Sequence, residues 1–123
     1  MVIVREIENI KIALPAEENF IISCTQDAVD LLGEAGSKDC SRIIIYESNL
    51  HPDFFKLASG LAGDILQKFS NYRFKLAIIG DFSKYKSKSF QDFIRESNKG
   101  NAVFFADDID IALFKLAHKN PAN

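Results

Sequence analysis

Hydrophobic and polar positions alternate with a period of two at the start of the chain. The alternation is loose from Val2 to Ile7 and clean from Ile10 to Leu14. This period is typical of β-strands. The polar pair Glu8-Asn9 separates the two runs and predicts a hairpin turn, and Pro15 ends the second run. The chain is therefore expected to begin with a β-hairpin.

Later segments carry apolar residues three or four positions apart, which predicts amphipathic helices. We expect Thr25 to cap the first helix, and Ser89 with Asp92 to form a capping box at the third. Asp107 or Asp108 is expected to cap the last helix. The predicted buried stripes are Ala28, Leu31, Leu32 and Ala35; Leu61, Ile65, Phe69 and Tyr72; Phe90, Phe93 and Ile94; and Ile109, Ala112, Leu113 and Leu116.

Short runs without any polar face separate these helices. They are Ile43 to Tyr46, Leu76 to Ile79 and Ala102 to Ala106. A strand that is apolar on both sides is buried on both faces, as in a parallel sheet covered by helices. The predicted order is β-β-α-β-α-β-α-β-α, which indicates one α/β domain over residues 1–123. Its sheet is mixed, mainly parallel, with an N-terminal β-hairpin.

Charge and composition narrow the functional classes. The chain has 123 residues, with 15 Lys and Arg against 17 Asp and Glu, and a net charge of -2. This balance gives no overall attraction to nucleic acid or to an anionic membrane. The apolar runs are far shorter than the roughly 20 residues that a membrane helix needs, and the N-terminus does not resemble a signal peptide. We therefore expect a cytoplasmic protein that binds neither nucleic acid nor membrane.

The cysteines and histidines do not form a pattern typical of a metal site. Cys24 and Cys40 are not part of a C-x-x-C pair, and His51 and His118 lie far from both in sequence. We expect both cysteines to be small buried apolar residues, and no metal or cofactor. The chain lacks G-x-S-x-G, H-E-x-x-H and Walker motifs, so no catalytic residue is assigned and enzymatic activity is left open.

Segments from the middle of the chain resemble a known family. They are FFKLASGLAGDILQKF at residues 54–69, KLAIIGDFSKY at 75–85 and FIRESNKG at 93–100. They resemble a bacterial family catalogued as domain of unknown function 4180. The similarity extends over nearly the whole chain, but the family name carries no activity, cofactor or catalytic residue.

A shorter resemblance is to the STAS domains, which include the anti-sigma factor antagonists. Ser59-Gly60-Leu61 is similar to the end of their D-S-S/T-G-L-G segment, where the residue before the glycine is phosphorylated by a partner kinase. Leu57 and Ala58 replace the first Asp and Ser, and Ala62 replaces the second Gly. The resemblance implies a STAS-like sandwich, for which a flavodoxin-like sheet is the alternative. It also implies that Ser59 acts as a phospho-switch.

The loop after the predicted fourth strand is a candidate anion site. Its hydroxyl and ammonium groups precede a helix, at the sheet edge where open α/β folds bind ligands. The alternative is a solvated loop. The candidate residues are Ser83, Lys84, Lys86, Ser87 and Ser89. Glu47, Asp81 and His51 are expected at the same edge, where an acid/base pair is a weaker alternative and His51 is more simply a turn residue.

The last helix has a second apolar face. Ile111 and Phe114 lie outside its main stripe, and His118 follows one turn later. Either the segment from Phe20 to Ile22 covers this face or a second copy of the chain does, and we expect a homodimer. The leading functional hypothesis is a small non-catalytic regulatory or protein-interaction module. The alternative is a binder of, or minimal enzyme acting on, a small anionic metabolite, which a deep cavity lined by Ser83, Lys84 and Glu47 would favour.

Overall fold

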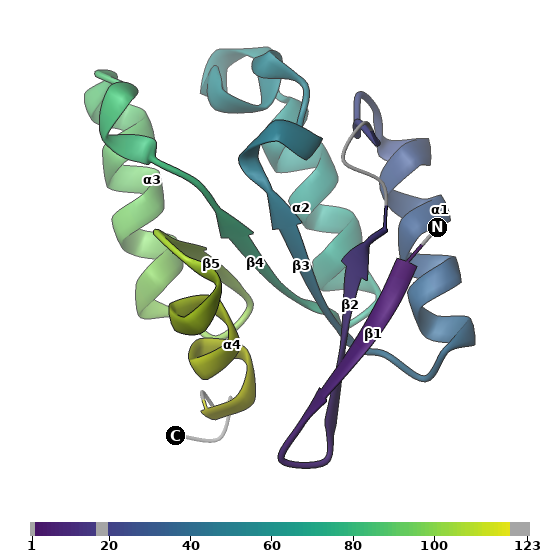
Figure 1. Cartoon of the computed structure of the whole chain (residues 1–123). Helices are drawn as coiled ribbons and strands as arrows, with labels where there is room; N and C mark the ends of the chain where they lie inside the picture. The colour runs from purple at the N-terminus through teal and green to yellow at the C-terminus, as the bar shows by residue number, and fades with distance from the viewer. Residues whose placement is uncertain (1, 17–19, 119–123) are drawn as a thin grey trace.

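The structure of the chain, a computed structural model, describes residues 2–16 and 20–118. The described strands form one five-stranded sheet in the order β1-β2-β3-β4-β5 (Figure 1). β1 and β2 pair antiparallel, and every later pairing is parallel. The strands are β1 (Val2–Ile7), β2 (Ile10–Pro15), β3 (Arg42–Tyr46), β4 (Lys75–Ile79) and β5 (Val103–Ala106). The predicted mixed α/β sheet with an N-terminal hairpin is confirmed.

Helices alternate with the parallel strands in the predicted order. They are α1 (Thr25–Ser37), α2 (Leu61–Asn71), α3 (Lys88–Lys99) and α4 (Ile109–His118). Short 3-10 turns occupy the loops at the carboxyl ends of β3 and β4: η1 (Glu47–Asn49), η2 (Pro52–Phe55), η3 (Leu57–Ser59) and η4 (Phe82–Lys84). The strand order differs from the 2-1-3-4-5 order of flavodoxin-like sheets, so that alternative is wrong.

The hairpin turn uses left-handed backbone at both central residues. Glu8 has a φ of 51° and Asn9 a φ of 68°. Two such residues form the type I′ turn, whose twist matches that of the adjoining strands. The polar pair therefore makes the predicted two-residue turn without a glycine.

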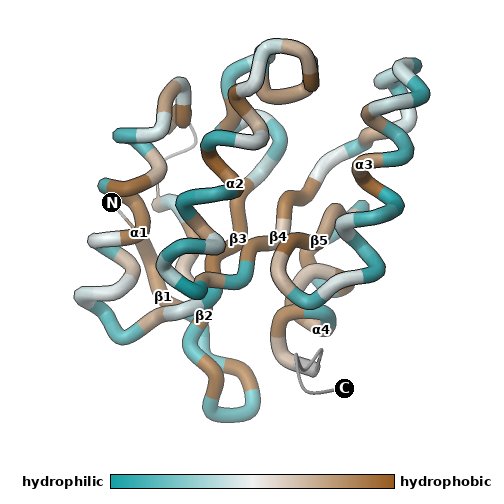
Figure 2. The backbone as a smooth tube through the Cα atoms, turned by 180° about the vertical axis from the view of Figure 1, so that it is seen from behind, coloured by the Kyte–Doolittle hydropathy of each residue, from teal (hydrophilic) through white to brown (hydrophobic). Residues whose placement is uncertain are grey.

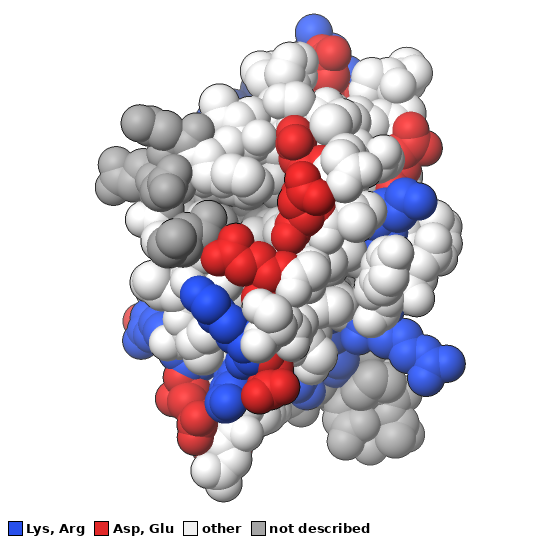
Figure 3. Space-filling model, turned by 90° about the vertical axis from the view of Figure 1, so that its right-hand side faces the viewer, with Lys and Arg blue, Asp and Glu red and all other residues white. Residues whose placement is uncertain are grey.

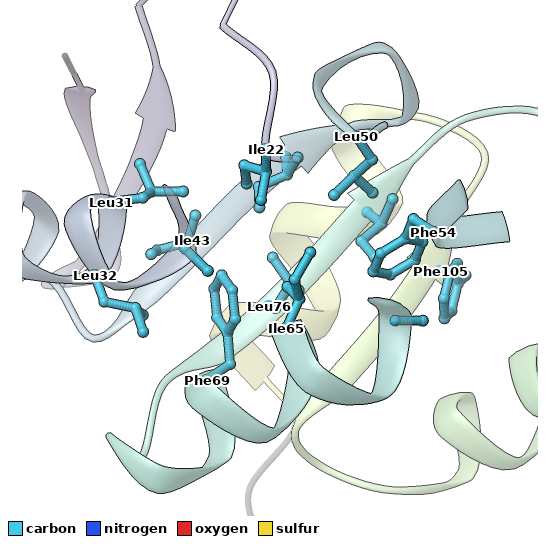
Figure 4. Packing of buried hydrophobic residues seen from close by; sticks show 14 of the residues in the cluster. Ile22, Leu31, Leu32, Ile43, Leu50, Phe54, Ile65, Phe69, Leu76 and Phe105 are labelled. Atoms are coloured by element: carbon cyan, nitrogen blue, oxygen red, sulfur yellow. The ribbon is translucent and has the colours of Figure 1, made fainter. Parts of the chain in front are cut away.

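The helices are divided unequally between the two faces of the sheet. α1, α2 and α3 lie behind it in Figure 1 and α4 lies in front. Phe54, Ile65 and Phe69 are fully buried with strand residues of the rear face (Figure 4). Phe104 is buried against α4 in the second apolar cluster. The central strands are apolar along their length (Figure 2), because both of their faces are covered.

Two predicted helix caps are wrong. The Ser87 hydroxyl, not that of Ser89, accepts a hydrogen bond from the Phe90 N–H at 3.2 Å, and α3 begins at Lys88. Thr25 lies inside α1 as its first residue. In both helices the capping position is the last residue with extended backbone, which comes just before the helix. A side chain within the first helical turn therefore cannot act as the cap.

Other predictions are confirmed at some residues and wrong at others. Asp108, one of the two residues predicted to cap α4, accepts a hydrogen bond from the Ile111 N–H at 2.9 Å. Tyr72 is 57% exposed instead of buried, because α2 ends one residue earlier. Cys40 is buried as expected, and its burial raises the pKa of the thiol, but Cys24 is exposed.

Candidate functional site

The carboxyl ends of β3, β4 and β5 share the upper edge of the sheet in Figure 1. Two cavities open there. The first, of about 440 Å³, lies between the loop after β3 and the loop after β4, and we call it the Glu47 cavity. It is lined by Glu47, Ser48, Leu50, Pro52, Phe55, Lys56, Lys84 and Tyr85. The second, of about 700 Å³, lies between α3 and α4, and we call it the α3–α4 crevice.

Glu47 is the central polar residue of its cavity. It directly follows β3, and its side chain is only 16% exposed. Its carboxylate accepts a hydrogen bond from the Tyr85 hydroxyl and forms an ion pair with the Lys84 ammonium at 2.7 Å. A Cβ on Gly80 would lie 2.6 Å from Glu47 Oε1 and 2.7 Å from Glu47 Cβ. Only glycine at the end of β4 therefore lets this side chain lie against the backbone.

Tyr85 joins the polar and apolar parts of the Glu47 cavity. Its ring stacks on Phe55 with centroids 4.7 Å apart and an interplanar angle of 12°. Burial, followed by the hydrogen bond to Glu47, raises the pKa of the Tyr85 hydroxyl above its ordinary value. The phenol therefore stays protonated at neutral pH and donates to the carboxylate.

Two lysines add positive charge to the Glu47 cavity. The Lys84 ammonium lies 5.4 Å from the centre of the Tyr85 ring, and the Lys84 side chain is 57% exposed. Lys56 is on the facing loop, where its ammonium lies 3.7 Å from an Asp53 carboxylate oxygen. An aromatic and aliphatic wall is thus combined with two exposed ammonium groups and one paired carboxylate.

The structure does not gather the predicted anion-binding residues at one point. Ser83 lines the α3–α4 crevice, where its hydroxyl donates to Asp81 Oδ1 at 2.6 Å. Hydrogen bonds from Ser83 lower the pKa of the Asp81 carboxyl. Lys86 donates to the Ser83 carbonyl at 3.3 Å, while Ser87 caps α3 and the Ser89 side chain is exposed. Of these candidates, Lys84 alone lines the Glu47 cavity.

Comparison with models of known protein families identifies the family of this chain. The model described as Domain of unknown function (DUF4180) matches residues 7–116. The chain belongs to this family. Comparison with curated proteins found no match, and comparison with solved structures found none. The function of this DUF4180 domain must therefore be argued from its own geometry.

Ser59 is exposed and lies two residues before the first residue of α2. Its hydroxyl donates to the Asp53 carbonyl at 2.6 Å and accepts from the Leu61 N–H at 3.2 Å. Gly60, between Ser59 and the helix, has a φ of 80°, a conformation that favours glycine. His51 accepts a hydrogen bond from the Asp53 N–H at 3.0 Å, which makes it a turn residue in the same loop. The Ser59 phospho-switch stays a prediction.

The second apolar face of α4 is exposed. Ile111 is 41% exposed and Phe114 is 62% exposed, whereas the side chain of His118 lies outside the described residues. Phe20 and Ile22 pack on the opposite face of the sheet, in the cluster with α1, α2 and α3. The alternative that they cover this face of α4 is therefore wrong. The homodimer stays a prediction, and light scattering on the free DUF4180 domain would test it.

Membrane-spanning helices and metal-binding clusters are both absent from residues 2–16 and 20–118. Within these ranges no helix combines the length and apolar character needed to cross a membrane. Among the same residues no group of three or more His, Cys, Asp or Glu side chains is placed to hold a metal ion. On the side that carries α1 and the hairpin, acidic side chains run down the surface (Figure 3).

Sequence analysis missed Phe55, Lys56 and Tyr85 as site residues. Phe55 and Tyr85 are both partners in one ring stack, but 30 positions separate them, and the family segments that contain them assign no function to either. A usable signal was present in the loop at residues 80–89, where Tyr85 is an aromatic residue among polar ones. An amphipathic aromatic residue in a polar loop at the ligand-binding edge is a reasonable site candidate.

Proposed function

We propose that this DUF4180 domain is a non-catalytic binding module that takes a small anion with an apolar body into the Glu47 cavity. The observation that carries the proposal is the pairing of an apolar wall with two ammonium groups. The wall is formed by Leu50, Pro52, Phe55 and Tyr85, and the ammonium groups belong to Lys56 and Lys84. Ligand pockets commonly combine apolar walls with a small number of placed polar groups.

The charges in the cavity favour an anion. Lys56 and Lys84 contribute two positive charges to the lining and Glu47 one negative charge, while the Asp53 carboxylate that pairs with Lys56 lies outside the lining. An ammonium has three N–H donors, and the ion pair with Glu47 leaves Lys84 able to donate to a second acceptor. A ligand carboxylate or phosphate beside Lys84 would complete this set. The ligand's apolar part would then contact Phe55 and Tyr85.

The hydrogen bonds of Glu47 and the protonation of Tyr85 support a binding role over a catalytic one. The Glu47 carboxylate is already engaged by the Tyr85 hydroxyl and the Lys84 ammonium. The Tyr85 phenol is held in its protonated form, since its pKa is raised. The phenol is therefore not a base near neutral pH, and the carboxylate oxygens already accept from two donors, so the arrangement favours binding over general acid–base catalysis.

Calorimetric titration tests the proposal. The probes are phenylacetate and phenyl phosphate, with neutral 2-phenylethanol as the comparison. We expect at least one anion to bind about ten-fold more tightly than the alcohol, because a charge-assisted hydrogen bond contributes roughly 1.5–3 kcal/mol. Lys84→Gln should remove this preference. Lys86→Gln is the matched control, because Lys86 lies in the same loop and does not line the cavity.

The proposal fails if neither anion binds, or if 2-phenylethanol binds as tightly as both. An equal loss of affinity in Lys84→Gln and Lys86→Gln would instead favour a diffuse attraction to the whole lysine loop. That outcome would restore the anion site that the sequence predicts and would remove the Glu47 cavity from the argument.

A second candidate function is a regulatory protein-interaction module switched at Ser59. The observation that favours it is the exposed hydroxyl beside the N-terminus of α2. A phosphate on Ser59 would add about 1.5–2 negative charges, and its oxygens would accept hydrogen bonds from the N–H groups at the start of the helix. Mass spectrometry of the protein from its native cells tests this, with phosphate expected on Ser59. Phosphorylation only at other serines, or none, would contradict it.

A further inference from the structure

The α3–α4 crevice lies where the chain changes sides of the sheet. α3 follows β4 on one face, whereas α4 follows β5 on the other (Figure 1). The loops that leave these neighbouring strands therefore diverge. In open α/β sheets, ligands bind in the crevice outside the carboxyl ends of the strands, and the diverging loops leave such a crevice here. The crevice is lined there by Gly80 and Asp81 after β4, and by Asp107 after β5.

Apolar side chains face the crevice from both helices. Ile94 of α3 and Ile111 of α4 line it, together with Phe105 of β5. Ile111 is 41% exposed, so apolar surface on the α4 side is open to a ligand. Two aliphatic side chains from different helices suit a flat ring, which gains contact area with both of them.

Two amide side chains in the crevice are held in fixed orientations. Asn98 Oδ1 accepts a hydrogen bond from the Phe105 N–H at 2.8 Å. Gln91 Nε2 donates to the carbonyls of Phe82 and Tyr85 at 2.8 and 2.7 Å. These bonds use the oxygen of one amide and the nitrogen of the other. The Asn98 NH₂ group and the Gln91 carbonyl can then serve a ligand as a donor and an acceptor.

The charged groups of the crevice are mainly acidic. Asp81 and Asp107 line it, and Lys115 is the one cation among its described lining residues, with an ammonium 5.9 Å from the centre of the Phe104 ring. Carboxylates accept hydrogen bonds from hydroxyl groups and repel phosphate. We propose that the α3–α4 crevice is a second binding site, for an uncharged heterocycle that carries hydroxyl groups, as a nucleoside does.

The test is an NMR titration of the ¹⁵N-labelled domain. The probes are adenosine, guanosine, cytidine and uridine, compared with D-ribose and with adenosine monophosphate. At least one nucleoside is expected to bind and to shift the amide signals of Gly80, Asp107 and Ile111. The signals of Leu50 and Lys56, which line the Glu47 cavity, should stay in place. This separation keeps the result independent of the function proposed for that cavity.

Variants make the assignment specific. Asp107→Asn should weaken nucleoside binding about ten-fold, as the loss of one charge-assisted hydrogen bond predicts. Asp110→Asn is the matched control, because this exposed carboxylate on α4 does not line the crevice. Ile111→Ala is a second variant that removes apolar contact without changing charge.

Several outcomes would overturn the proposal. They are the absence of binding by all four nucleosides, signal shifts confined to the Glu47 cavity, and tighter binding of adenosine monophosphate than of adenosine. Ribose that binds as tightly as every nucleoside would overturn the assignment of a heterocycle. Equal affinities of the Asp107→Asn and Asp110→Asn variants would remove the carboxylate from the site.

Discussion

The two cavities share the segment from Phe82 to Tyr85 as a wall but differ in how their charges are held. In the Glu47 cavity the carboxylate is largely buried and is engaged by two donors from this segment. In the α3–α4 crevice Asp81 and Asp107 are exposed. The first cavity is built by aromatic packing of short turns, and the second by two helices that lie on opposite faces. Neighbouring loops at one sheet edge thus provide opposite electrostatic environments.

The largest expected effect comes from Gly80, which lies between the two cavities. Gly80→Ala places a methyl group within 2.7 Å of Glu47 Cβ, so Glu47 must move. We expect a loss of about 2 kcal/mol in the free energy of unfolding, which is typical of overpacking. Urea unfolding measures this loss. A variant as stable as the parent would show that the close approach of Glu47 is dispensable.

Gly33→Ala is the matched control for Gly80→Ala. Gly33 is exposed inside α1, and a Cβ there meets no atom within 4 Å. Alanine should raise the free energy of unfolding by about 0.5–1 kcal/mol, because it restricts the unfolded chain and favours the helix. The two substitutions are therefore expected to have opposite signs. A gain in stability at both positions would mean that Glu47 moves away from residue 80 without cost.

A substitution at Gln91 tests whether its side-chain amide holds the Phe82–Tyr85 segment, the wall shared by the two cavities, in place. Gln91→Ala removes the donors to the Phe82 and Tyr85 carbonyls and should cost about 1.5 kcal/mol in urea unfolding. Gln67→Ala is the control, since Gln67 bonds only the exposed Asn71 side chain at 2.8 Å among the described residues. Equal losses in the two variants would mean that water replaces the Gln91 bonds without cost.

The fold was predictable from the sequence because burial follows hydrophobic periodicity. The run from Ile43 to Ile45 is buried on both faces, and Ala28, Leu31, Leu32 and Ala35 are all buried in α1. Such patterns depend on neighbours along the chain. Helix caps were less predictable, because Ser87 and Ser89 have the same chemistry and only the backbone conformation selects one of them.

The site was predictable only in its location at the sheet edge. The hydrogen bond between Tyr85 and Glu47 joins residues 38 positions apart, and no local pattern pairs them. The lysine loop looked like a single anion site in sequence. Folding divides it, because Lys84 turns toward Glu47 whereas Ser83 bonds Asp81. Side-chain partners of this kind follow from the packing of loops and not from periodicity.

Alkaline pH should lower the free energy of unfolding, because it removes the proton of the Tyr85 hydroxyl in the unfolded chain first. The raised pKa means that the folded protein keeps the phenolic proton that the unfolded chain releases above about pH 10. This contribution to stability is complete below that pH and is lost as the pH rises above it. By pH 10.5 one such group accounts for a loss of about 0.8 kcal/mol. Urea unfolding between pH 9 and 10.5 measures it.

Between pH 9 and 10.5, the Tyr85→Phe variant should lose less stability than the parent protein does. The difference is the contribution of the Tyr85 phenol. Tyr72→Phe is the control for removing a phenol from an exposed position. Its pH profile should differ less from that of the parent than the profile of Tyr85→Phe does. If the parent and Tyr85→Phe lose stability in parallel up to pH 10.5, the protonated phenol does not stabilise the cavity.

The smallest expected effect separates Lys84 from Lys86. Lys84→Gln removes the ion pair with Glu47 and should cost about 0.5 kcal/mol, since the lysine end is exposed and its gain is reduced by solvent. Lys86→Gln removes one long contact to the Ser83 carbonyl and should cost almost nothing. Urea unfolding at low salt and in 1 M NaCl measures both. Salt should reduce the Lys84 effect less than it would for two exposed charges, because Glu47 is largely buried. Equal effects that vanish together in salt would mean that the loop acts through its net charge alone, as in the solvated-loop alternative.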